Sequence, residues 1–313
     1  MVESKHQWKA WLYLAPAIVL LAVFTVWPII NTVGMAFIED YDIIKALGGQ
    51  EFEIGFGNFK EIINFGQFKT CLLNTVLLCV ITVPLSTLIA LLIAVCLNSI
   101  KPLNRTLQTI YFLPYVTNSI AIGMVFYQMF NIINVQQMGT NDSMVTQSII
   151  NQFLGWFGID PIVWINQGSS YAANLATMVI YIVWNALPFK ILILLGGLQS
   201  VNKQYYDAAK VDGTSRSRTL WRITVPLLSP MIAYVVITGF IGGFKEYTSI
   251  VGIFGDKMGP QDEPYRLNTM VGLIYNLINS NQGRAAAGAL ILFAIIFAVT
   301  LVNLYVSKKK VHY

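Results

Sequence analysis

Residues 71–97 read CLLNTVLLCVITVPLSTLIALLIAVCL, a run that contains no Asp, Glu, Lys or Arg. A helix needs roughly 20 mostly apolar residues to cross the hydrocarbon core of a bilayer. Five further stretches meet this criterion, near 12–37, 106–130, 172–197, 227–250 and 286–306. We therefore expect an all-α, polytopic membrane protein with six transmembrane helices, which together form a single transmembrane domain over residues 1–313.

The composition of the whole chain agrees with a membrane protein. Hydrophobic residues make up 56%, charged residues only 11%, and the mean hydropathy is +0.62. A soluble domain is about 25% charged, so these values exclude a soluble globule, a secreted disulfide scaffold and a nucleic-acid binder. Cys71, Cys79 and Cys96 lack the spacing of metal ligands, and we expect no metal site. The first apolar run continues to Phe37 without a cleavage site, which predicts a retained helix.

The distribution of Lys and Arg predicts the orientation. With a cytoplasmic N-terminus, twelve basic residues fall in inside segments and six in outside segments. The positive-inside rule then places both termini in the cytoplasm. The outside segment 131–171 has no Lys or Arg and carries an amphipathic pattern around Trp156. Two interpretations stay open for it: a helix on the outer membrane surface, or a loop packed on the helices.

Several enzymatic sites are excluded by the residues available. The two histidines, His6 and His312, lie at opposite ends of the chain, so a His-based triad or HExxH zinc site cannot form. No GxxxxGK[ST] phosphate loop is present. Glu246 is the sole acidic residue within a predicted span, which argues against a proton-coupled carrier.

The predicted cytoplasmic loop reads YYDAAKVDGTSRSRTLWRITVPLLSP over 205–230. Its pattern predicts a short helix, a turn at Gly213 and a second helix capped by Thr214 or Ser215. Arg218 and Arg222 are four residues apart, one helical turn, and Pro226 suits the start of the following helix. The pattern alone is also typical of a basic amphipathic loop resting on anionic lipid.

The order D-A-A-x-x-x-G, followed by I-T-x-P-L-L-x-P, closely resembles the EAA loop of permease subunits of bacterial ATP-binding-cassette importers. The resemblance is to the carbohydrate branch, the maltose and glycerol-phosphate type. It extends over nearly the whole chain, through WLYLAPAIVLLAVFTVWPII, FGNFKEII, the Asn74–Thr75 pair, LLGGLQSVNKQYYDAA and GRAAAGALILF. The usual first Glu is replaced by Asp207, whose carboxylate reaches one methylene less far.

This resemblance implies a type I importer permease fold in the bacterial cytoplasmic membrane. It implies that the loop over 205–226 is a coupling helix for a cytoplasmic ATPase dimer, with contacts from Asp207, Ala208, Ala209, Gly213, Arg218 and Pro226. Arg216, Arg218 and Arg222 would add charge contacts to the ATPase or to lipid, or would act only as a positive-inside anchor. A second permease would complete the pathway, and an external binding protein would deliver a sugar or oligosaccharide. The chain itself would not be an enzyme and would hold no cofactor, since ATP and Mg are bound by the ATPase.

A sugar requires hydrogen bonds and aromatic surfaces along its path. The candidates in the predicted spans are Tyr181, Trp184, Asn185, Phe244, Lys245, Glu246, Tyr247 and Asn276. For each of them an interfacial or helix-packing role is the alternative interpretation, and Lys190 is expected to snorkel to the cytoplasmic interface. A secondary carrier and a membrane-embedded enzyme are the alternative functions. A secondary carrier should show broken helices in repeated halves and buried ionisable groups, and neither stands out in this sequence. For a membrane-embedded enzyme, the sequence lacks suitably placed histidines and paired carboxylates.

Overall fold

The computed structural model describes residues 7–39, 41, 48–49, 52–100, 104–136, 143–146 and 148–310. Contacts between residues group the chain into two compact units. The first comprises residues 1–68 and 273–293, and the second comprises 69–272 and 294–313. The single transmembrane domain expected for residues 1–313 stays a prediction.

The first unit holds α1 (Gln7–Leu21), a π-helical segment (Ala22–Val26), α2 (Trp27–Phe37) and α4 (Gly57–Asn64). It also holds most of α15 (Met270–Ile278) and the first part of α16 (Gln282–Lys310). Asn58 joins α4 to the end of α2, because its side-chain amide donates to the carbonyls of Ala36 and Ile38 at 3.2 and 2.7 Å. This pair of hydrogen bonds gives the FGNF stretch a structural role.

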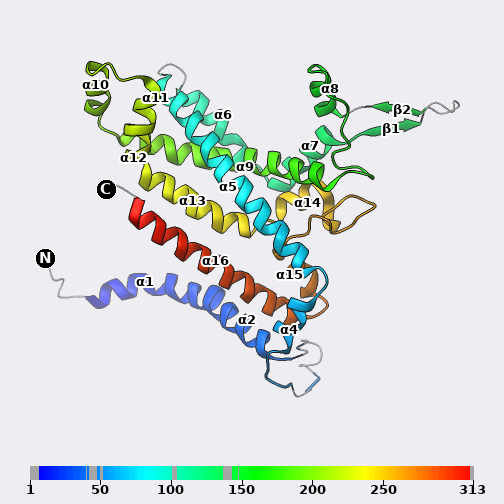
Figure 1. Cartoon of the computed structure of the whole chain (residues 1–313). Helices are drawn as coiled ribbons and strands as arrows, with labels where there is room; N and C mark the ends of the chain where they lie inside the picture. Colours follow the sequence, from blue (N-terminus) through cyan, green and yellow to red (C-terminus); the bar gives the residue numbers. More distant parts are fainter. Residues whose placement is uncertain are drawn as a thin grey trace. The chain divides into compact units, whose positions relative to one another are not determined.

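The second unit contains nearly all of α5 (Phe68–Ser99) and the helices α6 (Asn104–Val116), α7 (Ser119–Phe130), α8 (Ile149–Gly155) and α9 (Tyr171–Ser200). It continues with α10 (Lys203–Val211), α11 (Arg216–Thr219), a π-helical segment (Leu220–Thr224), α12 (Val225–Leu227), α13 (Ser229–Phe244), α14 (Thr248–Phe254) and a 3-10 turn (Gly255–Lys257). Strands β1 (Ile133–Gln136) and β2 (Ser143–Thr146) form an antiparallel ribbon that pairs Ile133 with Thr146. Figure 1 shows α10 and α11 at one end of this unit and α8 with the ribbon at the other.

Both π-helical segments have the same local cause. Each of them ends two residues before a proline, Pro28 in one case and Pro226 in the other. Proline has no N–H to donate to the carbonyl four residues earlier, and its ring collides with that carbonyl, so the helix widens locally.

Two apolar clusters form the core of the second unit. One joins Ala90, Leu91 and Ala94 of α5 to Ile191 and Leu194 of α9. The other surrounds the fully buried Tyr181 and includes residues of α7 and α14, whose backbones meet where Gly123 faces Gly252. A Cβ added to Gly123 would lie 2.6 Å from the Cα of Gly252, so this close approach requires glycine.

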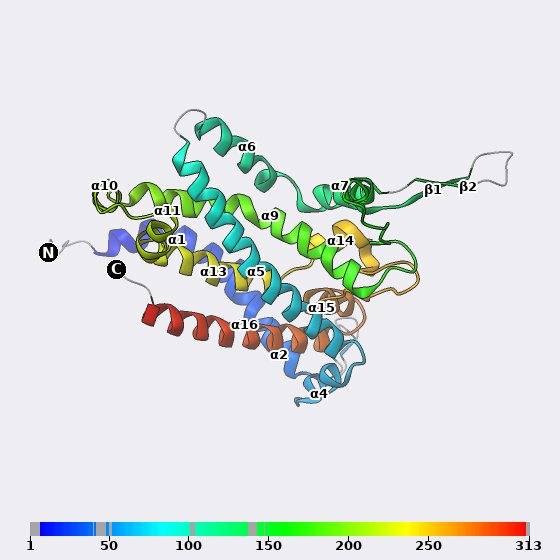
Figure 2. The same ribbon diagram turned by 45° about the horizontal axis from the view of Figure 1, so that its top comes forward.

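The third predicted span, 106–130, is two helices and not one. α6 ends at Val116 and α7 begins at Ser119, and Figure 2 shows them as separate helices. The cause is Asn118, which takes an extended backbone and accepts hydrogen bonds from the N–H groups of Ile120 and Ala121 as the N-cap of α7. Pro114 also weakens the last turn of α6.

The fifth predicted span, 227–250, is also interrupted. α13 ends at Phe244, after Gly242 and Gly243, and the chain breaks before α14. At its other end α13 follows the 216–227 segment at a bend of 70°. Within the described residues, four helices are long and apolar enough to cross a membrane: Trp8–Phe37, Phe68–Ser99, Tyr171–Ser200 and Gln282–Lys309. The bent pair makes up to five, so six uninterrupted spans are not confirmed.

Asn74 and Thr75 hold α5 against the start of α15. The Asn74 amide donates to the carbonyls of Arg266 and Asn268 at 3.0 and 2.9 Å, and its oxygen accepts from the Tyr171 hydroxyl at 2.8 Å. The Thr75 hydroxyl accepts from the N–H of Met270, the first residue of α15, at 2.9 Å. This polar pair thus satisfies backbone groups that would otherwise be buried without partners.

Candidate functional site

The α10–α11 turn has a defined geometry that depends on Gly213. The N–H of Gly213 donates to the carbonyl of Lys210 at 3.1 Å, and the N–H of Thr214 donates to that of Ala209 at 2.9 Å. With Gly213 at φ +64°, these are the two bonds of a Schellman motif, the helix ending that favours glycine. Ser215 then caps α11 by accepting from the N–H of Arg218, so of the two expected caps Ser215 is the one used.

The exposed side of α10 presents small and apolar groups. Tyr205 is 54% exposed and Val211 88%, and Ala208, midway between them, is exposed as well. Residues three apart share a helix face. Ala209 is buried, so it supports α10 from inside. Asp207 is exposed and forms an ion pair with Lys210 at 3.1 Å.

The remaining coupling candidates lie just beyond this turn. Arg216, Arg218 and Arg222 are exposed, and Pro226 is half-buried in α12. A π-helical segment (Leu220–Thr224) begins between Arg218 and Arg222. The loop therefore offers a rigid turn with an apolar face and a flank of exposed guanidinium groups.

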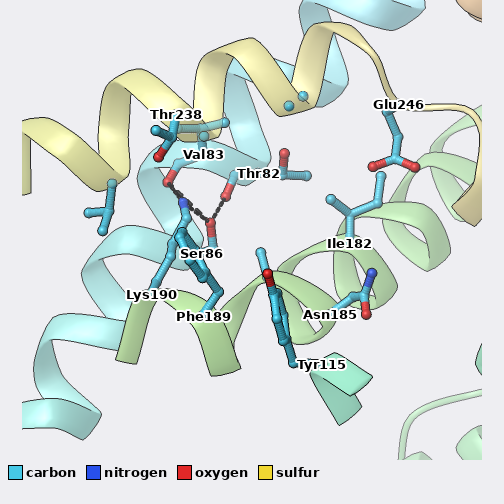
Figure 3. A pocket seen from close by; sticks show the side chains of 15 residues that line it. Thr82, Val83, Ser86, Tyr115, Ile182, Asn185, Phe189, Lys190, Thr238 and Glu246 are labelled. Atoms are coloured by element: carbon cyan, nitrogen blue, oxygen red, sulfur yellow. Dashed lines mark hydrogen bonds between the residues drawn. The ribbon is translucent and has the colours of Figure 1, made fainter. Parts of the chain in front are cut away.

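A cavity of about 290 Å³ lies among α5, α6, α9 and α13 of the second unit. Its polar lining consists of hydroxyl, amide, amine and carboxylate groups, from Thr82, Ser86, Tyr115, Asn185, Lys190, Thr238 and Glu246. Tyr115 and Phe189 are stacked rings 5.7 Å apart. Figure 3 shows Lys190 on one side of the cavity, with Asn185 and Glu246 on the other.

Lys190 is buried, with 4% of its surface exposed, and does not snorkel as expected. Its amine donates to the Val83 carbonyl at 3.1 Å and to the Ser86 hydroxyl at 2.7 Å (Figure 3). It also donates to the Thr87 hydroxyl at 2.9 Å, which uses all three N–H groups. Within the described ranges no carboxylate forms an ion pair with it. The carbonyl and hydroxyl groups of α5 accept the hydrogen bonds that water would accept if the Lys190 amine reached the membrane surface.

Glu246 follows the end of α13 and lines the cavity. One of its carboxylate oxygens accepts from the N–H of Ser249 at 3.2 Å, and its own carbonyl accepts from the Thr269 hydroxyl at 2.9 Å. The neighbouring Lys245 is exposed, and no ion pair between the two side chains is found among the residues that the structure describes. The helix break separates the two charges.

The other predicted pathway residues take different positions. Tyr181 is fully buried, and its hydroxyl donates to the Ser119 carbonyl at 2.5 Å, while Trp184 packs on Phe126. Phe244 is buried and Tyr247 is half-buried. Asn276 lies on α15 in the first unit and is exposed. Asn185 and Glu246 are thus the two predicted pathway residues that the cavity brings together.

Several cavity residues were missed by sequence reasoning. Four polar residues line the cavity although the sequence did not predict them as pathway residues: Thr82, Ser86, Lys190 and Thr238. A signal for the first two was present: Thr75, Cys79, Thr82 and Ser86 recur at four- and three-residue spacing, the period of one helix face, and all four are buried. No group of three His, Cys, Asp or Glu residues in the described part of the chain is placed to hold a metal.

At the α8 end, the segment around Trp164 packs on the helices. The Trp164 indole donates to Asn151 at 2.8 Å, and the Asn174 amide donates to the carbonyl of Trp164 at 2.7 Å. Asp262 receives a hydrogen bond from the N–H of Gly168 at 2.8 Å, which holds the pKa of its carboxyl below the ordinary value. The loop interpretation therefore holds for 162–169.

The family model described as "Binding-protein-dependent transport system inner membrane component" matches residues 73–312. The chain therefore belongs to this family of transport proteins. It also has the fold of an importer permease: a chain in the crystal structure of a bacterial ABC transporter involved in the import of the acidic polysaccharide alginate superposes with a TM-score of 0.75 at 21% identity, over 97% of this chain and 96% of that one.

Among curated relatives, the arabinooligosaccharides transport system permease protein AraP of Halalkalibacterium halodurans is 29% identical over 94% of this chain and 86% of its own length. The lactose transport system permease protein LacF of Rhizobium radiobacter is 26% identical, over 94% and 91%. The sn-glycerol-3-phosphate transport system permease protein UgpA of Rhizobium meliloti is 27% identical, over 97% and 96%. The similarity thus covers nearly the full length of each relative.

Proposed function

We propose that the chain is the membrane subunit of an ATP-driven importer for a sugar or oligosaccharide. The observation that carries this proposal is the cavity among α5, α6, α9 and α13. Its hydroxyl, amide and carboxylate groups can exchange hydrogen bonds with sugar hydroxyls, and its stacked rings offer a flat apolar surface. Relatives named for arabinooligosaccharides and lactose support this solute class.

The proposed partners are a second permease, a cytoplasmic ATPase dimer and an external binding protein. The exposed face of α10 and the rigid turn at Gly213 suit insertion into a groove of the ATPase, with Asp207, Ala208, Arg218 and Pro226 at or beside the contact. ATP and Mg are then bound by the ATPase, and this chain holds no cofactor. A related transporter crystallised with its alginate pentasaccharide-bound periplasmic protein supports the external partner.

Transport measurements with Glu246 variants test the solute site. Glu246→Gln keeps the shape of the side chain but removes the charge of a hydrogen-bond acceptor, a loss of about 1.5–3 kcal/mol for a bond to a charged group. We expect the sugar concentration for half-maximal ATP-dependent uptake to rise roughly ten- to 150-fold in proteoliposomes that contain the whole complex. Thr248→Val, at an exposed position two residues further on, is the matched control and should leave uptake unchanged.

These measurements test two claims separately: that the cavity lies on the solute pathway, and that the solute is a sugar. Unchanged sugar dependence in Glu246→Gln would remove the cavity from the pathway without affecting the transport function. Absence of ATP-dependent uptake of every sugar and oligosaccharide tested, neutral and acidic, in a complex that still hydrolyses ATP, would contradict a sugar importer.

We also propose that the α10–α11 end and both termini face the cytoplasm. Twelve basic residues on that side against six on the other support this orientation. A cysteine at position 215 in a cysteine-free protein should therefore resist an impermeant thiol reagent applied to intact cells, and a cysteine at position 160 should react. Reaction at 215 and protection at 160 would invert the assignment.

A further inference from the structure

The short helix α8 turns an apolar side away from the protein. The apolar residues on this side follow the four- and three-residue spacing of one helix face and of its extension beyond Gly155. We call them the aromatic face: Ile149, Phe153, Trp156 and Phe157. They are 57%, 52%, 82% and 69% exposed. The ring of Phe153 packs on those of Trp156 and Phe157 at 5.7 and 5.4 Å, so the face is one continuous patch.

The opposite side of α8 is fixed to the second unit. Asn151 is 1% exposed, donates to the carbonyl of Ile162 at 2.9 Å and accepts from the indole of Trp164 at 2.8 Å. Leu154 packs against the core cluster around Tyr181. Because these contacts hold α8 in one orientation, the exposure of the aromatic face is built into the fold and is not the fraying of a loose loop.

We propose that the aromatic face inserts into the headgroup region of the lipid leaflet at the α8 end. Residues 143–159 contain no charged side chain, and Asp160 follows directly. Trp and Tyr side chains are enriched at the level where a bilayer meets water, and Trp and Phe line the apolar side of helices that lie at that level. The helix α8 follows α7 and precedes α9, both apolar helices. The helix α7, which packs on α8, also exposes the apolar side chains of Met124 and Val125.

Lipid is the occupant favoured over a protein partner for a physical reason. The rim of a docking surface for a water-soluble protein is polar, whereas the 143–159 segment has no charged side chain and the nearest ones are Asp142 and Asp160 at its two ends. An apolar patch left in water would instead favour aggregation. Insertion would anchor α8 at a fixed depth, together with the 162–169 segment hydrogen-bonded to it.

Depth-dependent fluorescence quenching tests this proposal without a transport assay. A bimane label is attached to Trp156→Cys in the complete transporter, with Cys71, Cys79 and Cys96 replaced by Ala, in phosphatidylcholine nanodiscs. We expect nitroxide lipids labelled at the headgroup or carbon 5 to quench it at least three-fold more than a lipid labelled at carbon 16. The same label at Lys257→Cys, exposed in the 3-10 turn, is the matched control and should respond to aqueous iodide only.

Two results would overturn the proposal. One is quenching at 156 by iodide alone, as at 257, which would leave the aromatic face in water. The other is protection at 156 that arises only when purified external binding protein is added, which would assign the face to that protein. Neither result depends on sugar uptake, so the proposed transport function is tested separately.

Discussion

Replacing Gly213 by Val is expected to abolish sugar uptake while the protein stays in the membrane. Gly213 has φ +64°, a backbone conformation that a β-branched residue avoids at a cost of about 1–3 kcal/mol. Nothing lies within 4 Å of an added Cβ, so the effect comes from the backbone and not from a collision. The turn would open, and the two Schellman bonds to Lys210 and Ala209 would be lost.

The readout is solute-stimulated ATP hydrolysis by the reconstituted complex. A penalty of this size lowers the population of the native turn by roughly five- to 150-fold, so stimulation should fall to the basal rate. Gly213→Asn is the matched control, because Asn tolerates a left-handed backbone, and it should keep most of the activity. Equal loss of stimulated ATP hydrolysis in the Gly213→Asn and Gly213→Val variants would show that coupling to the ATPase does not depend on the conformation of this turn.

The overall class of the fold could be predicted because it depends on local composition. The apolar runs from Trp8, Phe68, Tyr171 and Gln282 are long helices in the structure, and their length follows from bilayer thickness. The breaks were harder to predict. Asn118 lies in the short polar sequence Thr117–Ser119 within an apolar run, and nothing in that pattern shows that its side chain caps α7 and so separates two helices.

The candidate site was predictable in part for the same reason. The turn at Gly213 depends on residues within one short loop, so the pattern around it was sufficient. Lys190 depends on groups more than 100 positions away, since Ser86 and Thr87 lie on α5. From its own helix Lys190 could only be expected to reach water, because nothing local indicates which hydroxyls α5 would present to it.

Removing the hydroxyl of Ser86 is expected to destabilise the protein more than removing the charge of Lys190. Ser86→Ala deprives a buried ammonium group of its 2.7 Å partner, and a lost hydrogen bond to a charged group costs about 1.5–3 kcal/mol. Lys190→Met keeps the length of the side chain and leaves no buried charge behind. Replacing a buried charged group by an apolar one of similar volume is often neutral or stabilising.

Thermal unfolding of the purified complex in detergent can measure both variants and their combination. Ser86→Ala alone should lower the midpoint by several degrees, and Ser86→Ala in the Lys190→Met background should have little further effect, because the ammonium group that needed the hydroxyl is gone. Equal shifts from Ser86→Ala in both backgrounds would show that Ser86 acts through packing. If the Lys190→Met variant stays folded and assembled but loses sugar uptake, the Lys190 amine serves transport and not stability. A role in transport would agree with its position, because Lys190 lines the same cavity as Glu246.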